Sequence, residues 1–297
     1  MTEVALFRSL LFVPGNSLRR IDKAATLDVD GVILDLEDSV PLAEKETART
    51  MVRDALPRVR TLWRRVYVRT NVVTGELAPL DIEAVVRPGL DGICIPKVES
   101  AGHILLAEGF LADAERKHGL EVGSVTLLPI IETAKGVMNA LEVASASPRV
   151  VGLLFGAEDF TLDMGITRTR RGRELFFARS QVVVAARAAG VAAVDTVYSD
   201  FRDREGLEQE AHLARHLGFV GKCLIHPDQL EIVNRMFSPS PEEIANAQKV
   251  VAAFQAAVAQ GSAAVSVEGR MVDVAVAERA KKTLQIAQAV ARATENY

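Results

Sequence analysis

The chain has 297 residues, which is enough for one large α/β domain or two ordinary ones, each with a sizeable core. Hydrophobic residues make up 49% and charged residues 25% of it, a composition typical of a globular enzyme that excludes a largely disordered chain. The net charge of −4 gives no general attraction to nucleic acid or to an anionic membrane. No apolar run reaches the roughly 18 residues of a membrane span, and the N-terminus is unlike a signal peptide, so a cytoplasmic location is expected.

Short apolar runs rich in β-branched residues recur along the chain and alternate with stretches of helical composition. The predicted strands cover residues 9–15, 31–38, 65–71, 92–100, 125–133, 150–159, 191–198 and 221–227. Continuous apolar strands that alternate with helices are typical of a parallel sheet covered on both faces, and the number of units matches a (β/α)8 TIM barrel. An open doubly wound sheet is the alternative, but the glycine fingerprint that normally follows its first strand is absent.

Beyond the eighth strand the chain continues further than a barrel requires. The stretch SPSPEE at residues 238–243 interrupts it, and an Ala-rich helical stretch, a hairpin-like segment and a terminal helix follow. We therefore expect a barrel domain over residues 1–237 and a C-terminal helical segment over residues 241–297. Within the barrel, Gly190 ends a helical stretch and suits a helix C-cap.

Nearly every predicted strand ends in polar side chains, and active sites of such barrels are built at the C-terminal ends of the strands. In chain order these ends carry Asn16; Asp35, Glu37 and Asp38; Arg69 and Asn71; Lys97 and Glu99; Glu132; Glu158 and Asp159; Asp195; and His226. A solvated turn explains one such end but not nearly all of them. The pattern therefore predicts a ring of polar groups that converge on one rim.

Glu132 and Asp159 end neighbouring strands of the predicted barrel. Two carboxylates without a His or Cys cluster nearby suit Mg²⁺, which prefers oxygen ligands and keeps several waters, rather than Zn²⁺. The alternative is that either acid pairs with Lys97 or Lys135. Arg69, at the end of the third strand, can bind a carboxylate through two parallel hydrogen bonds, or can pair with the acids of the second strand. A metal beside an arginine is a place to bind an α-keto or α-hydroxy acid.

For four other residues we favour a structural role over a chemical one. Lys97 raises the question of Schiff-base chemistry, but the acids around it favour its charged form, which argues against a nucleophilic amine. His226 precedes a proline at a strand end, which favours a structural role over that of a general base. Cys94 and Cys223 lie within apolar runs and are interpreted as free, buried thiols.

Several motifs along nearly the whole chain appear in the order known from one enzyme family. They are RSLLFVPGN, GVILDLEDSV, VYVRTN, GICIPKVES, LLPIIETAKG, LLFGAEDFTLDMG, KCLIHPDQL and GRMVD. Through them the sequence resembles the citrate lyase β-subunit-like branch of the HpcH/HpaI aldolase and citrate lyase superfamily, whose members include malyl-CoA, β-methylmalyl-CoA and citramalyl-CoA lyases. The resemblance implies that Glu132 and Asp159 bind Mg²⁺, that Arg69 clamps the substrate carboxylate with Glu132 also at the substrate site, and that Glu37 and Asp38 orient metal-bound waters.

The resemblance also assigns residues to the thioester and to proton transfer. Asp273 of GRMVD resembles a catalytic acid/base that relatives carry on a segment folded over the active site of a neighbouring subunit, which implies a lid and a homo-oligomer, a trimer or a hexamer. Phe12 and Lys23 keep the family's CoA-binding pattern. Ser17 stands where relatives often have an arginine beside the CoA phosphates, and Arg19 or Arg20 is a candidate to replace that charge.

Together these features predict a Mg²⁺-dependent carbon–carbon lyase. It would cleave, or form, a 3-hydroxyacyl-CoA such as malyl-CoA or citramalyl-CoA, with acetyl-CoA and a 2-oxo acid on the other side of the reaction. A malyl-CoA thioesterase that adds water at the same site is one alternative, and an acyl lyase subunit of a citrate lyase complex is another. The expected partners are a CoA thioester and a 2-oxo acid, with no nucleic acid and no membrane.

Overall fold

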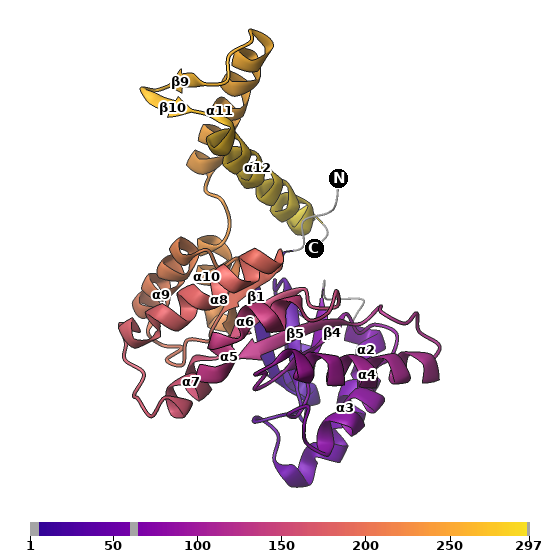
Figure 1. The fold of residues 1–297 in the computed structure, drawn as a ribbon. Helices are drawn as coiled ribbons and strands as arrows, with labels where there is room; N and C mark the ends of the chain where they lie inside the picture. The colour runs from indigo at the N-terminus through magenta and orange to yellow at the C-terminus, as the bar shows by residue number, and fades with distance from the viewer. Residues whose placement is uncertain (1–5, 60–64, 296–297) are drawn as a thin grey trace. The chain divides into compact units, whose positions relative to one another are not determined.

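A computed structural model gives the fold and describes residues 6–59 and 65–295. Eight parallel strands close into a barrel in chain order, each paired with the next and the last with the first (Figure 1). The strands are β1 Ser9–Pro14, β2 Gly31–Asp35, β3 Val66–Arg69, β4 Gly92–Ile95, β5 Thr126–Ile131, β6 Gly152–Phe155, β7 Ala192–Asp195 and β8 Gly221–Leu224. The predicted (β/α)8 TIM barrel is confirmed, and the doubly wound alternative is wrong.

Helices and short 3₁₀ turns connect the strands and surround the barrel. They are α1 Leu18–Ala24, η1 Leu42–Glu44, α2 Lys45–Val59, α3 Leu77–Val85, α4 Ala101–Lys117, α5 Ala134–Met138, α6 Ala140–Ser145, α7 Ala157–Asp163, η2 Arg173–Leu175, α8 Phe176–Ala189, α9 Arg204–Leu217, η3 Pro227–Gln229 and α10 Leu230–Met236. Gly190 ends α8 with a φ of 76°, the left-handed conformation that glycine adopts without strain, as predicted for a C-cap.

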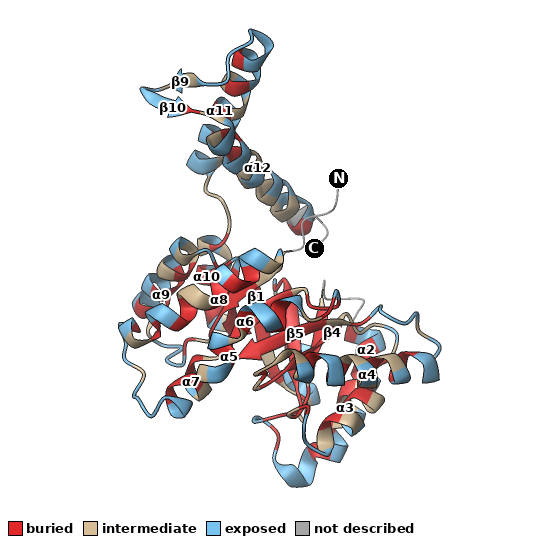
Figure 2. Ribbon diagram, in the orientation of Figure 1, coloured by how far each residue is buried: buried red, intermediate tan, exposed pale blue. Residues whose placement is uncertain are grey.

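The barrel interior is a packed core rather than a channel. It is filled by side chains that all eight strands direct inward, and the strands are almost entirely buried (Figure 2). The core cluster consists of Phe7, Leu10, Ile33, Tyr67, Cys94, Leu128, Ile130, Leu154, Val194 and Cys223. Both cysteines are free and buried, as predicted. Burial raises the pKa of each thiol, so neither is an activated nucleophile.

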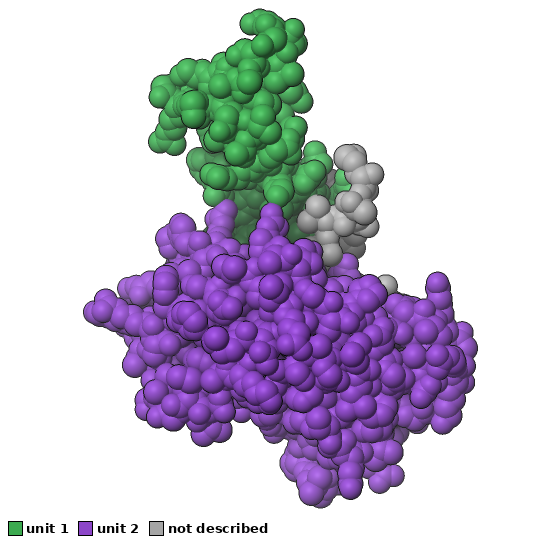
Figure 3. All heavy atoms as spheres, in the orientation of Figure 1, with its two compact units in different colours: residues 1–6, 235–297 green, residues 7–234 purple. Residues whose placement is uncertain are grey.

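The described chain divides into two compact units, which Figure 3 shows in different colours. Residues 7–234 form the barrel unit, and residues 235–295 with Leu6 form the second unit. The second unit contains α11 Pro241–Ala259, the antiparallel hairpin of β9 Val265–Val267 and β10 Arg270–Val272, and α12 Val274–Glu295. It has a core of its own, made of Ala247, Val250, Phe254, Val272, Ala277 and Ala280.

Among residues 6–59 and 65–295, no helix is both long enough and apolar enough to cross a bilayer.

A buried ion pair on the helix side of the barrel joins α4 to the start of β6. Arg149 donates to Glu115 through both ends of its guanidinium, Nη1 to Oε1 at 2.8 Å and Nη2 to Oε2 at 2.7 Å. The backbone amides of Gly123 and Val125 also donate to the Glu115 carboxylate, which is fully buried. Burial raises the pKa of Glu115, but the hydrogen bonds from Arg149 and the two amides outweigh it and hold the pKa below its usual 4.5.

Replacing Glu115 with Gln should destabilise the protein by about 3–5 kcal/mol, because Arg149 would stay buried without its fully buried countercharge. Glu108→Gln is the matched control. Its carboxylate lies 3.5 Å from Nε of the same arginine but is partly exposed, so its loss should cost less than about 1 kcal/mol. Urea unfolding of the three proteins at neutral pH measures the difference, and equal stability of wild type and Glu115→Gln would contradict the expectation.

The advantage of wild type over Glu115→Gln should also depend on pH. Since the folded-state pKa of Glu115 is lowered, its ionised form stabilises the fold above pH 4.5, and that contribution is lost as the pH falls through the folded-state pKa. The stability gap should therefore shrink below pH 4.5. A gap that stays constant down to about pH 3 would show that the pair does not act through the carboxylate charge.

Candidate active site

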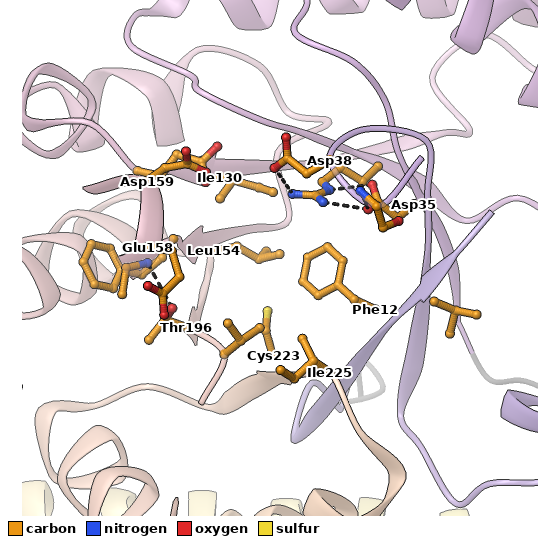
Figure 4. A pocket seen from close by; sticks show the side chains of 18 of the residues that line it. Phe12, Asp35, Asp38, Ile130, Leu154, Glu158, Asp159, Thr196, Cys223 and Ile225 are labelled. Atoms are coloured by element: carbon orange, nitrogen blue, oxygen red, sulfur yellow. Dashed lines mark hydrogen bonds and ion pairs between the residues drawn. The ribbon is translucent and has the colours of Figure 1, made fainter. Parts of the chain in front are cut away.

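A cavity of about 460 Å³ opens at the C-terminal ends of the barrel strands (Figure 4). Its floor is apolar, and Phe12, Ile130, Leu154 and Cys223 contribute to it. Charged side chains from separate strand exits also line it: Asp35 and Asp38, Arg69, Glu132, and Glu158 and Asp159. The predicted convergence of polar side chains on one rim is thus present for these residues.

Asp35 and Arg69 lie opposite each other in the register of β2 and β3, and their side chains form a bidentate ion pair. Arg69 donates from Nε to Oδ1 and from Nη2 to Oδ2, both at 2.7 Å. Nη1 lies 2.9 Å from Glu37 Oε2 and 3.5 Å from Asp38 Oδ2. The sequence left open whether Arg69 pairs with the acids at the end of the second strand, and the structure shows that it does. Asp35 takes two of the five N–H groups of Arg69, so a ligand would bind at the Nη1 end and one N–H of Nη2, where Glu37 and Asp38 also lie.

Asp35 also anchors the acidic turn that follows β2. Its carboxylate accepts from the backbone amides of Glu37 at 2.8 Å and Ser39 at 3.1 Å. Burial raises the pKa of Asp35, but the hydrogen bonds and charge of Arg69 outweigh burial, so the pKa lies below its usual value. Lys45 holds the same turn from the other side by donating to the carbonyls of Leu36 and Glu37, each at 2.7 Å.

Glu132 follows β5 and is buried, with 3% of its surface exposed. Its Oε1 accepts from the backbone amide of Lys97 at 2.8 Å. Its carboxylate also lies directly against Gly156, at the end of β6, where a Cβ would overlap it. Burial, and next the negative charge of Asp159, raise the pKa of Glu132 to about 8. A cation bound beside Glu132 would favour its ionised form and so offset both effects on the pKa.

Lys97 follows β4 and lies between acids that follow β2 and β6, and its backbone is left-handed with a φ of 52°. Its Nζ lies 3.0 Å from Glu37 Oε1 and 3.9 Å from Asp159 Oδ1. Burial lowers the pKa of Lys97, but the charge of Glu37 outweighs it and the pKa is raised, so the amine stays an ammonium. The interpretation against a nucleophilic amine agrees with this geometry. The contact of Asp159 with Lys97 is long, and Lys135 pairs with Glu99 instead.

Glu132 and Asp159 suit a hard divalent cation. No group of three or more His, Cys, Asp or Glu side chains positioned for a metal occurs in the described part of the chain. The protein would thus supply two carboxylates, and water or an oxygen-rich ligand would complete the coordination, an arrangement that Mg²⁺ tolerates well. Glu37 Oε2 is buried and makes no hydrogen bond of good geometry, although Arg69 Nη1 lies 2.9 Å away. This oxygen can therefore accept a hydrogen bond from a water.

A second hollow of about 550 Å³ adjoins the first and shares Phe12 and Arg20 with it. Lys23 and Arg19 also line it, so three cationic side chains border this hollow. The ring of Phe12 lies 5.0 Å from the guanidinium carbon of Arg69. The two residues that the family resemblance assigns to CoA, Phe12 and Lys23, therefore share one hollow.

Other residues predicted for the rim lie elsewhere. Asp195 is fully buried with Arg179 and Lys222 between the barrel wall and its helices, and does not line the cavity. Three polar side chains have structural partners: Asn71 donates to Asp81, Asn16 donates to Glu44, and the His226 ring accepts from the amide of Asp228 to cap η3. None of these four side chains lines the first cavity, and there the predicted ring is wrong. His226 lines the second hollow and has the structural role that the sequence favoured.

Asp273 belongs to the second unit, where it precedes α12. Its Oδ1 accepts from the backbone amide of Val276 at 3.0 Å, the contact of a helix N-cap. Sequence reasoning missed this capping role, as it missed Gly156 and Lys45 in the barrel unit. The glycine in the motif FGAED was the available signal for a close approach of another side chain to the backbone.

Proteins of known name resemble this chain over nearly its whole length. The chain is 42% identical to the citrate lyase subunit beta of Leuconostoc mesenteroides, over 97% of this chain and 96% of that protein. It is 40% identical to a (3S)-malyl-CoA thioesterase of Cereibacter sphaeroides, over 96% of both chains. The protein CitE of Mycobacterium tuberculosis, solved in complex with magnesium, acetoacetate and coenzyme A, matches 95% of this chain and all of its own, with 34% identity and a TM-score of 0.77. The model of one family also matches residues 8–227, and with these relatives it shows that the chain belongs to the HpcH/HpaI aldolase/citrate lyase family.

Proposed function

We propose that the protein is a Mg²⁺-dependent carbon–carbon lyase that cleaves, or forms, a 3-hydroxyacyl-CoA such as malyl-CoA or citramalyl-CoA. The observation that carries the proposal is the pair of Glu132 and Asp159 at one cavity with Arg69. The buried Glu132 carboxylate, whose pKa is raised to about 8, faces a second carboxylate and lacks a direct cationic partner among the contacts described above. The magnesium, acetoacetate and coenzyme A bound to the Mycobacterium tuberculosis relative support the same assignment.

Each of these residues has a distinct task in the proposal. Glu132 and Asp159 would hold the ion, and Glu37 and Asp38 would orient waters around it. When bound there, Mg²⁺ would supply electrophilic stabilisation of an oxygen that gains negative charge. Arg69 would bind the carboxylate of the 2-oxo acid with its Nη1 and Nη2 ends, because Asp35 already occupies the Nε side.

The thioester would extend from this cavity past Phe12 into the second hollow. Arg19, Arg20 and Lys23 border that hollow and carry positive charge suited to the phosphates of coenzyme A. The apolar floor of the first cavity suits the short acyl chain. Phe12 lines both hollows and would lie beside the arm that connects the acyl group to the nucleotide.

Cleavage requires a base that removes the proton of the 3-hydroxyl group. The bond between the hydroxyl-bearing carbon and the carbon next to the thioester carbonyl then breaks, and its electron pair moves to the enolate of acetyl-CoA. The second product is the 2-oxo acid, and a proton added to the enolate completes the reaction. By family resemblance, Asp273 of the C-terminal segment, residues 241–297, is the proposed acid/base. It would act from a lid on a neighbouring subunit of a homotrimer or hexamer.

Two alternatives use the same site. A thioesterase would add water to the thioester carbonyl and release CoA and malate. The 40% identity to a malyl-CoA thioesterase, over nearly the length matched by the citrate lyase subunit, keeps this candidate open. The second alternative is a subunit of a citrate lyase complex, which would act on a partner-bound acyl group rather than on free CoA esters.

Product analysis separates these activities. Purified protein with Mg²⁺ should release glyoxylate or pyruvate from malyl-, β-methylmalyl- or citramalyl-CoA, and EDTA should stop the release. Assays for both 2-oxo acid and free thiol on each thioester provide the measurement. Free thiol without 2-oxo acid would establish the hydrolase instead. Turnover of none of the three esters would favour the complex subunit, and activity that survives exhaustive chelation would contradict the metal role.

Gly156→Ala should weaken Mg²⁺ binding by about 10–100-fold, because the new methyl group would displace the Glu132 carboxylate. The φ of Gly156 is −106°, so alanine adopts this backbone without strain and the fold should persist. Gly109→Ala is the matched control, since nothing lies within 4 Å of its added Cβ. Calorimetric titration with Mg²⁺ measures the effect. Unchanged affinity in Gly156→Ala would contradict the assignment of Glu132 as a ligand.

Asp273→Asn should lower the rate by about 10²–10⁴-fold, the usual contribution of a general base. Asparagine caps helices as well as aspartate, so the melting temperature should not change. Asp273→Ala removes both the base and the cap, and should additionally cost about 1 kcal/mol of stability. Rate assays and thermal melts on both variants test the assignment. An Asp273→Asn enzyme with wild-type rate would restrict Asp273 to its capping role.

The oligomeric part of the proposal has its own test. Asp273→Asn subunits mixed with Arg69→Ala subunits should regain part of the activity, because some sites would combine an intact barrel with an intact lid. Subunit exchange is followed separately with differently tagged chains. Exchange without recovered activity would show that Asp273 acts within its own chain or is not the base.

A further inference from the structure

A line of alternating charges runs between the barrel wall and its helices, outside the cavity described above. Arg179 of α8 donates to both oxygens of Asp195 in β7, at 3.0 and 2.9 Å. Lys222 of β8 donates to Asp195 at 2.8 Å and to Glu210 of α9 at 2.6 Å. All four side chains are buried, and their charges balance.

Arg168 extends this line to the rim of the cavity. Its Nη2 donates to Glu210 Oε2 at 3.0 Å and to the carbonyl of Val197 at 2.9 Å, and its Nη1 donates to Glu158 Oε1 at 2.7 Å. The Arg168 side chain is 12% exposed. Glu158 and Val197 both line the cavity and follow different strands, β6 and β7. One guanidinium therefore joins two neighbouring strand exits to the buried network.

The segment that Arg168 contacts is short, and its far end is held by Asp163, whose carboxylate accepts from the Ala134 amide at 2.7 Å. α7, Ala157–Asp163, is only 7 residues long, and its buried residues are Ala157, Phe160 and Thr161. Two further polar contacts join its start to the β7 exit: the Ala157 amide donates to Thr196 Oγ1 at 3.0 Å, and Ser199 Oγ donates to Glu158. Asp159 follows Glu158 in the same first turn. Its position therefore depends on the polar contacts of this turn as well as on the packing of Phe160 against Phe155.

We propose that Arg168 is a positioning residue that fixes the first turn of α7 against the β7 exit and so keeps Asp159 at the cavity that Glu132 also lines. The inference rests on the proposed function, since the cation-binding role of Asp159 is itself proposed. Arg168 acts through the segment and touches no substrate. An arginine is required because its planar fork reaches Glu158, Val197 and Glu210 at once, whereas a lysine ammonium is a single point charge.

The variants Arg168→Met and Arg168→Lys test this inference, with Arg170→Met as the matched control. Arg170 lies in the same loop and also forms a bidentate ion pair, but its partner is Asp203, which does not line the cavity. Hydrogen exchange of the amides in residues 157–163 and calorimetric Mg²⁺ titration are the two readouts. Both Arg168 variants should exchange faster in this segment and bind Mg²⁺ about tenfold more weakly, and Arg170→Met should match wild type in both.

Several results would overturn the proposal. Exchange and Mg²⁺ affinity within twofold of wild type in Arg168→Met would show that the arginine does not hold α7. Faster exchange with unchanged Mg²⁺ affinity would show that the contacts of Arg168 do not determine the position of Asp159. If Arg168→Met does not fold, Glu158→Met removes only the half-exposed acceptor of Arg168 Nη1, and wild-type exchange in that variant overturns the proposal. Wild-type protein that binds no Mg²⁺ would instead reject the proposed function, while hydrogen exchange would still decide whether Arg168 holds α7.

Discussion

The ion pair between Asp35 and Arg69 is the interaction on which the rest of the candidate site depends. The two residues face each other across β2 and β3, and two hydrogen bonds of 2.7 Å fix the plane of the guanidinium. The same carboxylate binds the amides of the acidic turn through Glu37 and Ser39. The buried Asp35 thus orients both the Arg69 guanidinium and the acidic turn beside it. Its loss would leave Arg69 partly buried beside fewer countercharges.

Much of this arrangement follows from the sequence. Alternation of apolar strands with helical stretches was sufficient to predict the barrel, and position at strand ends was sufficient to find Arg69, Glu132 and Asp159. The error at Asp195 has a clear physical cause. Successive side chains of a strand point to opposite faces, so a residue at a strand end faces the barrel interior only if its parity matches the core. Val194 belongs to the core, which turns the next residue, Asp195, toward the helices.

The same parity rule accounts for three of the residues that do converge. Ile33, Tyr67 and Ile130 fill the interior, and the residues two positions later are Asp35, Arg69 and Glu132. No pattern in one sequence reveals partners that meet only in the fold, such as the bond from Arg168 to Glu158. The capping contact of Asp273 belongs to the same class, and it means that one carboxylate has both a local structural task and a proposed chemical one. The cytoplasmic location and the domain boundaries at residues 237 and 241 stay predictions.

The left-handed backbone of Lys97, with a φ of 52°, has a consequence for efforts to make the enzyme more heat-resistant. Such a conformation costs a non-glycine residue on the order of 1–3 kcal/mol, so glycine or asparagine would relieve the strain. Selection for thermal stability alone would favour those substitutions. It would also remove the ammonium group that separates Glu37 from Asp159. Directed evolution of this fold therefore needs a screen for turnover at every round, because one accessible gain in stability lies at a residue whose charge contacts two acids of the site.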